Sequence, residues 1–166
     1  MNPVPLFLII VTLPLLLGGC GEKDIKLKTF WYENGEMKNQ VNFKNGKMDG
    51  LLKGWYENGD KKLEKYFKDG KRDGSSVMWY ENGQKMEEIM YKNDQKDGLE
   101  TQWYENGQKK IEVTFRNDKI DGLYTTWHEN GQIKAEASWK DGERISLKLW
   151  NSKGEPVDTS EEAEAE

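Results

Sequence analysis

Hydrophobic and polar residues alternate along most of this chain, and residues 99–122 show the pattern clearly. Odd positions there hold Leu99, Thr101 and Trp103, then Ile111, Val113 and Phe115. The even positions between them hold mainly Glu, Gln, Lys and Arg. Alternation with period two is typical of a β-strand that has one apolar and one polar face. Each unit therefore predicts two strands, with the odd-numbered residues of both on one face.

The same pattern recurs at a fixed interval. The string WYENG begins at Trp31, Trp55, Trp79 and Trp103, and WHENG begins at Trp127, always 24 residues apart. A fixed period of about 20 to 50 residues indicates a repeat architecture. Because 24 is even, we expect one face to recur as a continuous apolar ladder, for example Leu51, Trp55, Leu63 and Phe67 in one unit.

Two short connections join the strands. Strings rich in Asn, Asp and Gly, such as KNGKMDG and KDGKRDG, close each unit and are typical of turns. Turns this short leave no room for a crossover helix, so consecutive strands should pair antiparallel. The predicted fold class is all-β: an elongated, twisted, single-layer antiparallel meander of about five 24-residue hairpin repeats.

The requirement that odd-numbered residues stay on one face selects the length of the loop inside WYENG. A two-residue loop would place Trp103 opposite Lys110 and break the alternation, whereas a three-residue loop at residues 105–107 places Thr101 opposite Ile111 and preserves it. We predict the three-residue loop, with glycine in the left-handed conformation that suits it best. The turn glycines are Gly35, Gly59, Gly83, Gly107 and Gly131.

The last unit is irregular, because WNSKG at Trp150 follows WHENG after 23 residues. Two registers are open. Either a loop has lost one residue, which we favour, or the register is ungapped and Leu147 with Leu149 fills the ladder.

Residues 1–19 carry an apolar segment, Val4 to Leu17, that is too short to span a bilayer. Small residues follow it, which is typical of a signal peptide. The string Leu17-Gly18-Gly19-Cys20 resembles the bacterial lipobox, which implies that Cys20 is lipid-modified and becomes the mature N-terminus. The alternative is a cysteine that merely follows a signal peptide or a buried free thiol.

The lipobox resemblance implies a localisation. Two or three acyl chains anchor a protein stably, so we expect a lipid-anchored protein of the bacterial cell envelope. Gly21, rather than Asp, after the cysteine implies the outer membrane where one is present. Residues 20–26 would form a tether. Cys20 is the only cysteine, which excludes an internal disulfide.

Charge is concentrated at the C-terminal end. The net charge is −5, but six acidic residues fall within residues 155–166, so the remainder carries +1. With three Arg and no basic stripe, the chain lacks what nucleic-acid binding requires. The 155–166 segment is acidic and poor in apolar residues, and we predict a disordered tail there.

The inventory of reactive residues argues against an enzyme. The single histidine, His128, stands where other units have Tyr, and no serine has a His–carboxylate pair nearby in sequence. Glu recurs once per WYENG turn rather than as a pair in two environments. Asp121-Gly122 matches part of a calcium loop, but Lys119 and His128 occupy ligand positions. We expect no catalytic residue, no metal and no cofactor.

The repeated aromatic residues form two candidate rows. Trp31, Trp55, Trp79, Trp103 and Trp127 are predicted to be the structural ladder. Tyr32, Tyr56, Tyr80 and Tyr104, with His128, fall on the opposite face and are candidate partner-binding residues. The alternative for the Tyr row is cross-strand packing against neighbouring Lys side chains.

The aromatic pair, the Glu-Asn-Gly turn and the closing Asn/Asp-Gly turns resemble the MORN repeat, in the bacterial variant found in YwqK-family antitoxins. The resemblance covers residues 27–154. It implies a single-layer sheet that acts as a non-enzymatic binding scaffold, with a protein partner that could be a toxin. Two other functions stay open: binding of cell-wall glycan, and a purely structural spacer in the envelope.

Overall fold

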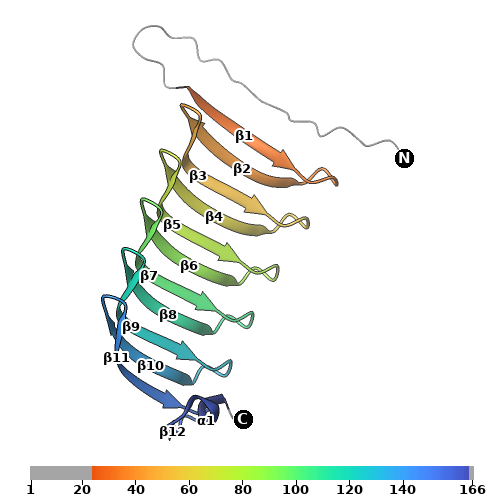
Figure 1. Cartoon of the computed structure of the whole chain (residues 1–166). Helices are drawn as coiled ribbons and strands as arrows, with labels where there is room; N and C mark the ends of the chain where they lie inside the picture. The colour runs from red at the N-terminus through yellow and green to blue at the C-terminus, as the bar shows by residue number, and fades with distance from the viewer. Residues whose placement is uncertain (1–23, 165–166) are drawn as a thin grey trace.

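The computed structural model describes residues 24–164, which form one twelve-stranded antiparallel sheet and a short helix. Each strand pairs with the strands before and after it in sequence, so that the sheet is an elongated meander (Figure 1). The strands are β1 Ile25–Trp31, β2 Met37–Lys44, β3 Lys47–Trp55, β4 Lys61–Lys68, β5 Lys71–Trp79, β6 Lys85–Lys92, β7 Gln95–Trp103, β8 Lys109–Arg116, β9 Lys119–Trp127, β10 Ile133–Lys140, β11 Glu143–Trp150 and β12 Pro156–Val157; helix α1 is Ser160–Glu164. The predicted fold class is confirmed.

The WYENG turn is the predicted three-residue loop. The Tyr104 N–H donates to the carbonyl of Gln108 at 2.9 Å, and the Gly107 N–H donates back to the carbonyl of Tyr104 at 2.9 Å. Gly107 has φ +82°, in the left-handed region where glycine costs least.

The predicted register beyond that loop is wrong by one residue. Thr101 lies opposite Glu112 rather than Ile111, because the pairing shifts between Gln102 and Trp103. Lys110 is the extra residue on β8, a β-bulge that moves every later side chain of the strand to the other face. The continuous odd-numbered ladder is therefore wrong as well.

The bulge divides the apolar residues between two faces. We name face A the side that carries Leu63, Ile89 and Val113, and face B the side that carries the Trp residues of WYENG. Pairing places Leu63 opposite Gly54, whereas Trp55 pairs with Lys61 on face B. Seven of the buried side chains lie on face A: Val41, Ser76, Ile89, Glu100, Val113, Ala135 and Ala137. Face A is the packed side of a sheet that no second layer covers between residues 24 and 164.

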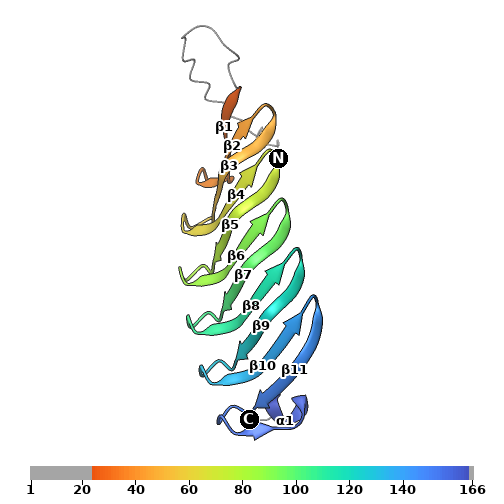
Figure 2. The same ribbon diagram turned by 90° about the vertical axis from the view of Figure 1, so that its left-hand side faces the viewer.

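The closing connection is a two-residue turn. Lys92 lies opposite Gln95, and Asn93 and Asp94 between them have φ +51° and +71°, as a type I′ turn requires. The following Asp-Gly pair lies inside the next strand instead of in the turn. Gly98 there has φ +128°, and a Cβ on it would approach the Met90 Cβ to 3.0 Å. Figure 2 shows the strands bowed along their length.

The last unit keeps the same turn at WNSKG. The Asn151 N–H donates to the carbonyl of Glu155 and the Gly154 N–H donates to that of Asn151, as Tyr and Gly do in WYENG. The missing residue lies within β11, which has 8 residues where β9 has 9. Leu147 and Leu149 also fill face A beside Ala137 and Ala135. The favoured explanation, a shortened loop, is therefore wrong because the strand is shortened, whereas the placing of Leu147 and Leu149 among the apolar residues is right.

The predicted disorder of the acidic tail is wrong for residues 155–164. β12 pairs with the end of β11, and Ala163 of α1 is buried against the sheet. A capping box starts the helix: the Glu162 N–H donates to Thr159 Oγ1 at 3.2 Å, and the Thr159 N–H donates to Glu162 Oε2 at 3.1 Å. This local exchange orders the segment despite its charge.

The predicted signal peptide, the string that resembles a lipobox and Cys20 lie outside residues 24–164, the part of the chain that the structure describes, so these features stay predictions. Within that range, α1 is too short to cross a membrane.

Candidate binding surface

The Tyr row joins neighbouring repeats through its hydroxyls, and partner binding by its rings stays a prediction. Each Tyr hydroxyl donates to the backbone carbonyl of the Trp that opens the next repeat. The bonds are Tyr32 to Trp55 at 2.8 Å, Tyr56 to Trp79 at 2.6 Å, Tyr80 to Trp103 at 2.8 Å and Tyr104 to Trp127 at 2.8 Å. His128 keeps the pattern, with Nε2 at 3.1 Å from the carbonyl oxygen of Trp150. The hydroxyls are thus occupied, while the Tyr rings remain half-buried at the edge of face A.

The Asn of WYENG makes a second junction between repeats. Asn82 Oδ1 accepts from the Gln84 N–H at 2.9 Å, which closes its own turn, and Asn82 Nδ2 donates to the carbonyl of Glu105 at 2.9 Å. Asn34, Asn106 and Asn130 repeat both bonds. Among residues 24–164, Asn58 closes its own turn only, so the motif fixes every turn and attaches four of the five to the following one.

The environment favours the protonated form of the Tyr56 and Tyr80 hydroxyls. Burial raises the pKa of Tyr80, and the carboxylate of Glu105 raises it further. Burial and Glu81 act in the same way on the pKa of Tyr56. A raised pKa favours the neutral phenol, the form that can donate to a carbonyl.

The Trp row forms a stacked ladder on face B rather than a buried core. Trp31 is 44% exposed, and the other Trp residues of the row are half-buried. One Lys ammonium lies over each of three successive rings: Lys61 at 4.9 Å from the centroid of Trp79, Lys85 at 5.5 Å from Trp103, and Lys109 at 5.5 Å from Trp127. Such cation–π contacts stabilise exposed aromatic rings.

The lysines of face B are also paired with carboxylates. Lys61 lies 3.0 Å from Glu64, Lys85 lies 2.7 Å from Glu88, and Lys109 pairs with Glu112. The ammonium groups that lie over the Trp ladder are therefore neutralised within the second, third and fourth repeats.

The lysines of face A stack on the Tyr rings. Lys38 lies 5.2 Å from the ring centroid of Tyr32, Lys62 lies 5.0 Å from Tyr56, and Lys110 lies 5.4 Å from Tyr104. None of these three ammonium groups has a carboxylate within ion-pair distance among residues 24–164. We call Tyr32, Tyr56, Tyr104 and their three lysines the Lys–Tyr row.

The alternative given for the Tyr row, packing against neighbouring Lys side chains, is confirmed for these three rings. The sequence did not show which lysines take part, because adjacent lysines go to opposite faces. Two repeats carry adjacent lysines, Lys61-Lys62 and Lys109-Lys110. Because of the bulge, the first lysine of each pair lies on face B and the second lies over a Tyr ring. A hydropathy pattern reads both as polar and carries no signal for the division. Knowing the position of the bulge in one repeat would have given the division of the lysines between the two faces in the other repeats.

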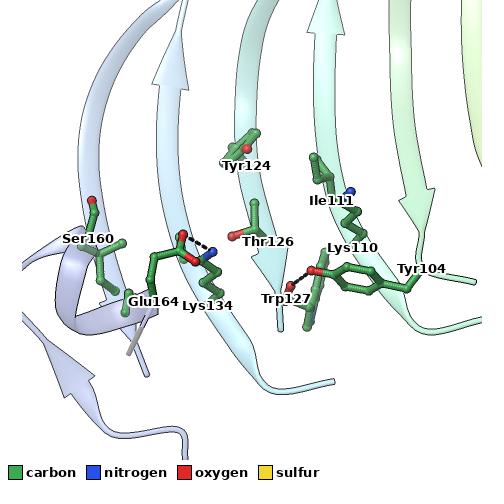
Figure 3. A pocket seen from close by; sticks show the side chains of 12 residues that line it. Tyr104, Lys110, Ile111, Tyr124, Thr126, Trp127, Lys134, Ser160 and Glu164 are labelled. Atoms are coloured by element: carbon green, nitrogen blue, oxygen red, sulfur yellow. Dashed lines mark hydrogen bonds and ion pairs between the residues drawn. The ribbon is translucent and has the colours of Figure 1, made fainter. Parts of the chain in front are cut away.

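A cavity of about 330 Å³ opens at the C-terminal end of face A (Figure 3). Tyr104, Lys110 and Ile111 line one side, and Ala163 of α1 lines the other. Lys134 also lines the cavity, and its ammonium forms an ion pair with the Glu164 carboxylate. That bond and charge hold the pKa of Glu164 below its ordinary value.

The geometry offers little for catalysis or metal binding within residues 24–164. No group of three His, Cys, Asp or Glu side chains lies close enough there to hold a metal ion. His128 contacts a backbone carbonyl through its ring nitrogen. It makes no hydrogen bond to a serine hydroxyl within residues 24–164. The surface presents aromatic rings, aliphatic side chains and ammonium groups, which suits binding by contact.

Comparison with known protein families gives five matches to one family, described as MORN repeat variant. The matched segments are residues 27–45, 48–69, 72–93, 96–117 and 120–141. Each segment covers one hairpin, for example β3 and β4 in the second. A comparison with curated proteins finds no match.

Proposed function

The chain belongs to the MORN repeat family, in its variant form, and we propose from this premise that it is a non-enzymatic scaffold whose face A binds a protein partner. The repeats supply a long, regular sheet, and the Tyr–Trp and Asn–Glu bonds hold one repeat to the next. Such a sheet offers an extended surface without a deep pocket, and a surface of this kind fits a macromolecule better than a small substrate.

One observation carries the proposal: the difference between the two faces. On face B, one Lys beside the Trp row is paired with a Glu in each of the second, third and fourth repeats, whereas the three lysines of the Lys–Tyr row have no carboxylate partner between residues 24 and 164. Aromatic rings beside unpaired cations, over half-buried aliphatic residues, are typical of protein-binding surfaces. Face A is therefore the binding surface, and face B stabilises the sheet.

The site of action is the bacterial envelope in this proposal. Cys20 carries the lipid anchor, and the tether predicted for residues 20–26 is shorter than expected, because β1 already begins at Ile25. A partner met there would be a protein of the envelope or an incoming toxin, so the scaffold would act as an antitoxin or immunity protein by covering that partner. Glycan binding and a spacer role are the two rival functions.

Site-specific photocrosslinking tests the binding face. A photoreactive amino acid is placed at Lys62 on face A or at Lys61 on face B, and the full chain is irradiated in intact cells. We expect one protein to be captured from position 62 and not from position 61, and that protein, once purified, to bind the purified chain. Equal capture from both positions, or none, contradicts the proposal; retention on isolated peptidoglycan instead would support glycan binding.

The anchor and the antitoxin role need separate tests. Cys20→Ser should move the protein from the membrane fraction to the soluble fraction, and persistence in the membrane would contradict the anchor. Expression of the captured protein alone should inhibit growth, and co-expression of the chain should restore it. If the captured protein is not toxic, the scaffold function stands and the antitoxin role is contradicted.

A further inference from the structure

Helix α1 shows what one lysine of face A binds when a ligand is within reach. Lys134 stands 24 residues after Lys110, at the equivalent place in the last hairpin. Its ammonium group pairs with Glu164, and Ala163 next to that residue is 1% exposed. An acidic helical segment with a small residue thus packs on face A at this repeat (Figure 3).

The upstream repeats carry the same chemistry with no such segment. Lys38, Lys62 and Lys110 occupy the place of Lys134 in their hairpins, and α1 packs near β11 and β12. Their ammonium groups stack on Tyr rings but meet no carboxylate in the part of the chain that the structure describes. The third hairpin has Met86 at this place, so the row of cations is interrupted once.

We propose that the partner segment bound by face A is an acidic helix, whose carboxylates meet Lys38, Lys62 and Lys110 as Glu164 meets Lys134. This inference rests on the proposed function and specifies the partner's chemistry. Charge complementarity supports it, because these three lysines are cations left unmatched beside apolar side chains.

The spacing of the row fits a helix that lies along the sheet. One repeat is two strands, or about 9.6 Å at roughly 4.8 Å per strand. A helix rises about 1.5 Å per residue, so residues seven apart are separated by about 10.5 Å and lie on the same side. A carboxylate at every seventh position would therefore follow the row from repeat to repeat, with one carboxylate facing Met86 between Lys62 and Lys110.

The test uses the full chain and a defined probe. The probe is a fluorescent Ala-rich helical peptide of 21 residues that carries Glu at every seventh position, and its binding is followed by anisotropy at low ionic strength. A double variant, Lys62→Gln with Lys110→Gln, removes two cations of face A. The matched control, Lys61→Gln with Lys109→Gln, removes the same charge from the adjacent residues on face B. Circular dichroism verifies that both variants keep the sheet.

We expect the face A variant to weaken peptide binding about tenfold or more, because it loses two charge-assisted contacts. The face B variant should change it less than about twofold. Equal weakening in both variants would mean that net charge alone attracts the peptide, and would overturn the inference. Absence of binding to the wild type, or equal binding of a peptide with Gln for every Glu, would overturn it as well.

The outcome separates this inference from the proposed function. If position 62 crosslinks a protein that lacks an acidic helix and the peptide does not bind, the scaffold stands and the acidic-helix inference fails. If the peptide binds face A while no envelope protein is captured, the surface chemistry stands and the protein-partner function fails.

Discussion

The hydroxyl of Tyr80 donates a 2.8 Å hydrogen bond to the backbone carbonyl of Trp103, one repeat further along the chain. The acceptor lies 23 residues away, at the end of β7, the first strand of the next hairpin. Stability in repeat proteins comes from each unit together with its interface to the neighbours. Tyr80 therefore contributes to the coupling between repeats as well as to its own turn.

Tyr80→Phe should lower the free energy of unfolding by about 1 kcal/mol, because it removes one donor and leaves the Trp103 carbonyl without that bond. Tyr66→Phe is the matched control, since Tyr66 is 47% exposed and its hydroxyl makes no bond to the residues that the structure describes. Urea unfolding measures both. A loss of equal size in the two variants would mean that the Tyr80 bond adds nothing.

The stability of the sheet should fall in alkaline solution. Burial first, and Glu105 next, raises the pKa of Tyr80 above its ordinary value of about 10, and burial likewise raises that of Tyr56. A folded-state pKa above the unfolded value means that the contribution is complete below about pH 10 and is lost as the pH rises through the folded pKa. The urea midpoint should fall above pH 10, and less steeply in a variant with both residues changed to Phe. A midpoint with the same pH dependence in both proteins would refute this.

Lys96→Met should cost roughly 3 kcal/mol, because it removes the cation from a buried carboxylate. Glu100 is 4% exposed, and its Oε2 accepts from Lys96 Nζ at 2.6 Å. Burial alone would lower the pKa of Lys96, but the bond to Glu100 raises it overall.

Glu100→Leu provides the matched comparison for that pair. Leu52 occupies the equivalent place two repeats earlier, so the site accepts an aliphatic side chain. We expect Glu100→Leu to be neutral or stabilising, and to recover most of the loss when combined with Lys96→Met. An equal loss from Glu100→Leu alone would show that the pair itself stabilises face A.

Gly98→Ala should destabilise the sheet by about 2 kcal/mol or more. The φ of +128° is one that an L-residue rarely adopts, and the new Cβ would approach the Met90 Cβ at 3.0 Å. Leu99→Ala, at the next residue, is the control, because Leu99 is 47% exposed and should cost less. Thermal unfolding of both variants measures the difference. A loss below about 0.5 kcal/mol in Gly98→Ala would mean that the strand can straighten there.

The period and the turn residues were sufficient to predict the sheet. A 24-residue interval with alternating strands and Asn-Gly turns leaves few alternatives to a hairpin meander, and the loop ending at Gly107 followed from parity. The bulge at Lys110 could not be predicted, because Lys109 and Lys110 look alike in any polar–apolar pattern although they lie on opposite faces. That single residue decides which apolar side chains share a face.

Two further features depend on information that a pattern lacks. The Tyr80 hydroxyl bonds to a backbone carbonyl, and a carbonyl has no signature in the sequence. The tail was assigned by composition, yet Thr159 and Glu162 form a capping box that was visible as a motif. The hydrogen bonds of this capping box order the segment despite its net negative charge.

The central claim is that face A binds the partner and face B does not, and calorimetric titration of the photocaptured, purified protein tests it most directly. The chain with Lys62→Gln and Lys110→Gln is compared with the chain carrying Lys61→Gln and Lys109→Gln. We predict that the dissociation constant rises about tenfold or more for the first variant and stays within about twofold for the second. A dissociation constant that rises equally in both, or only in the second, would contradict the claim.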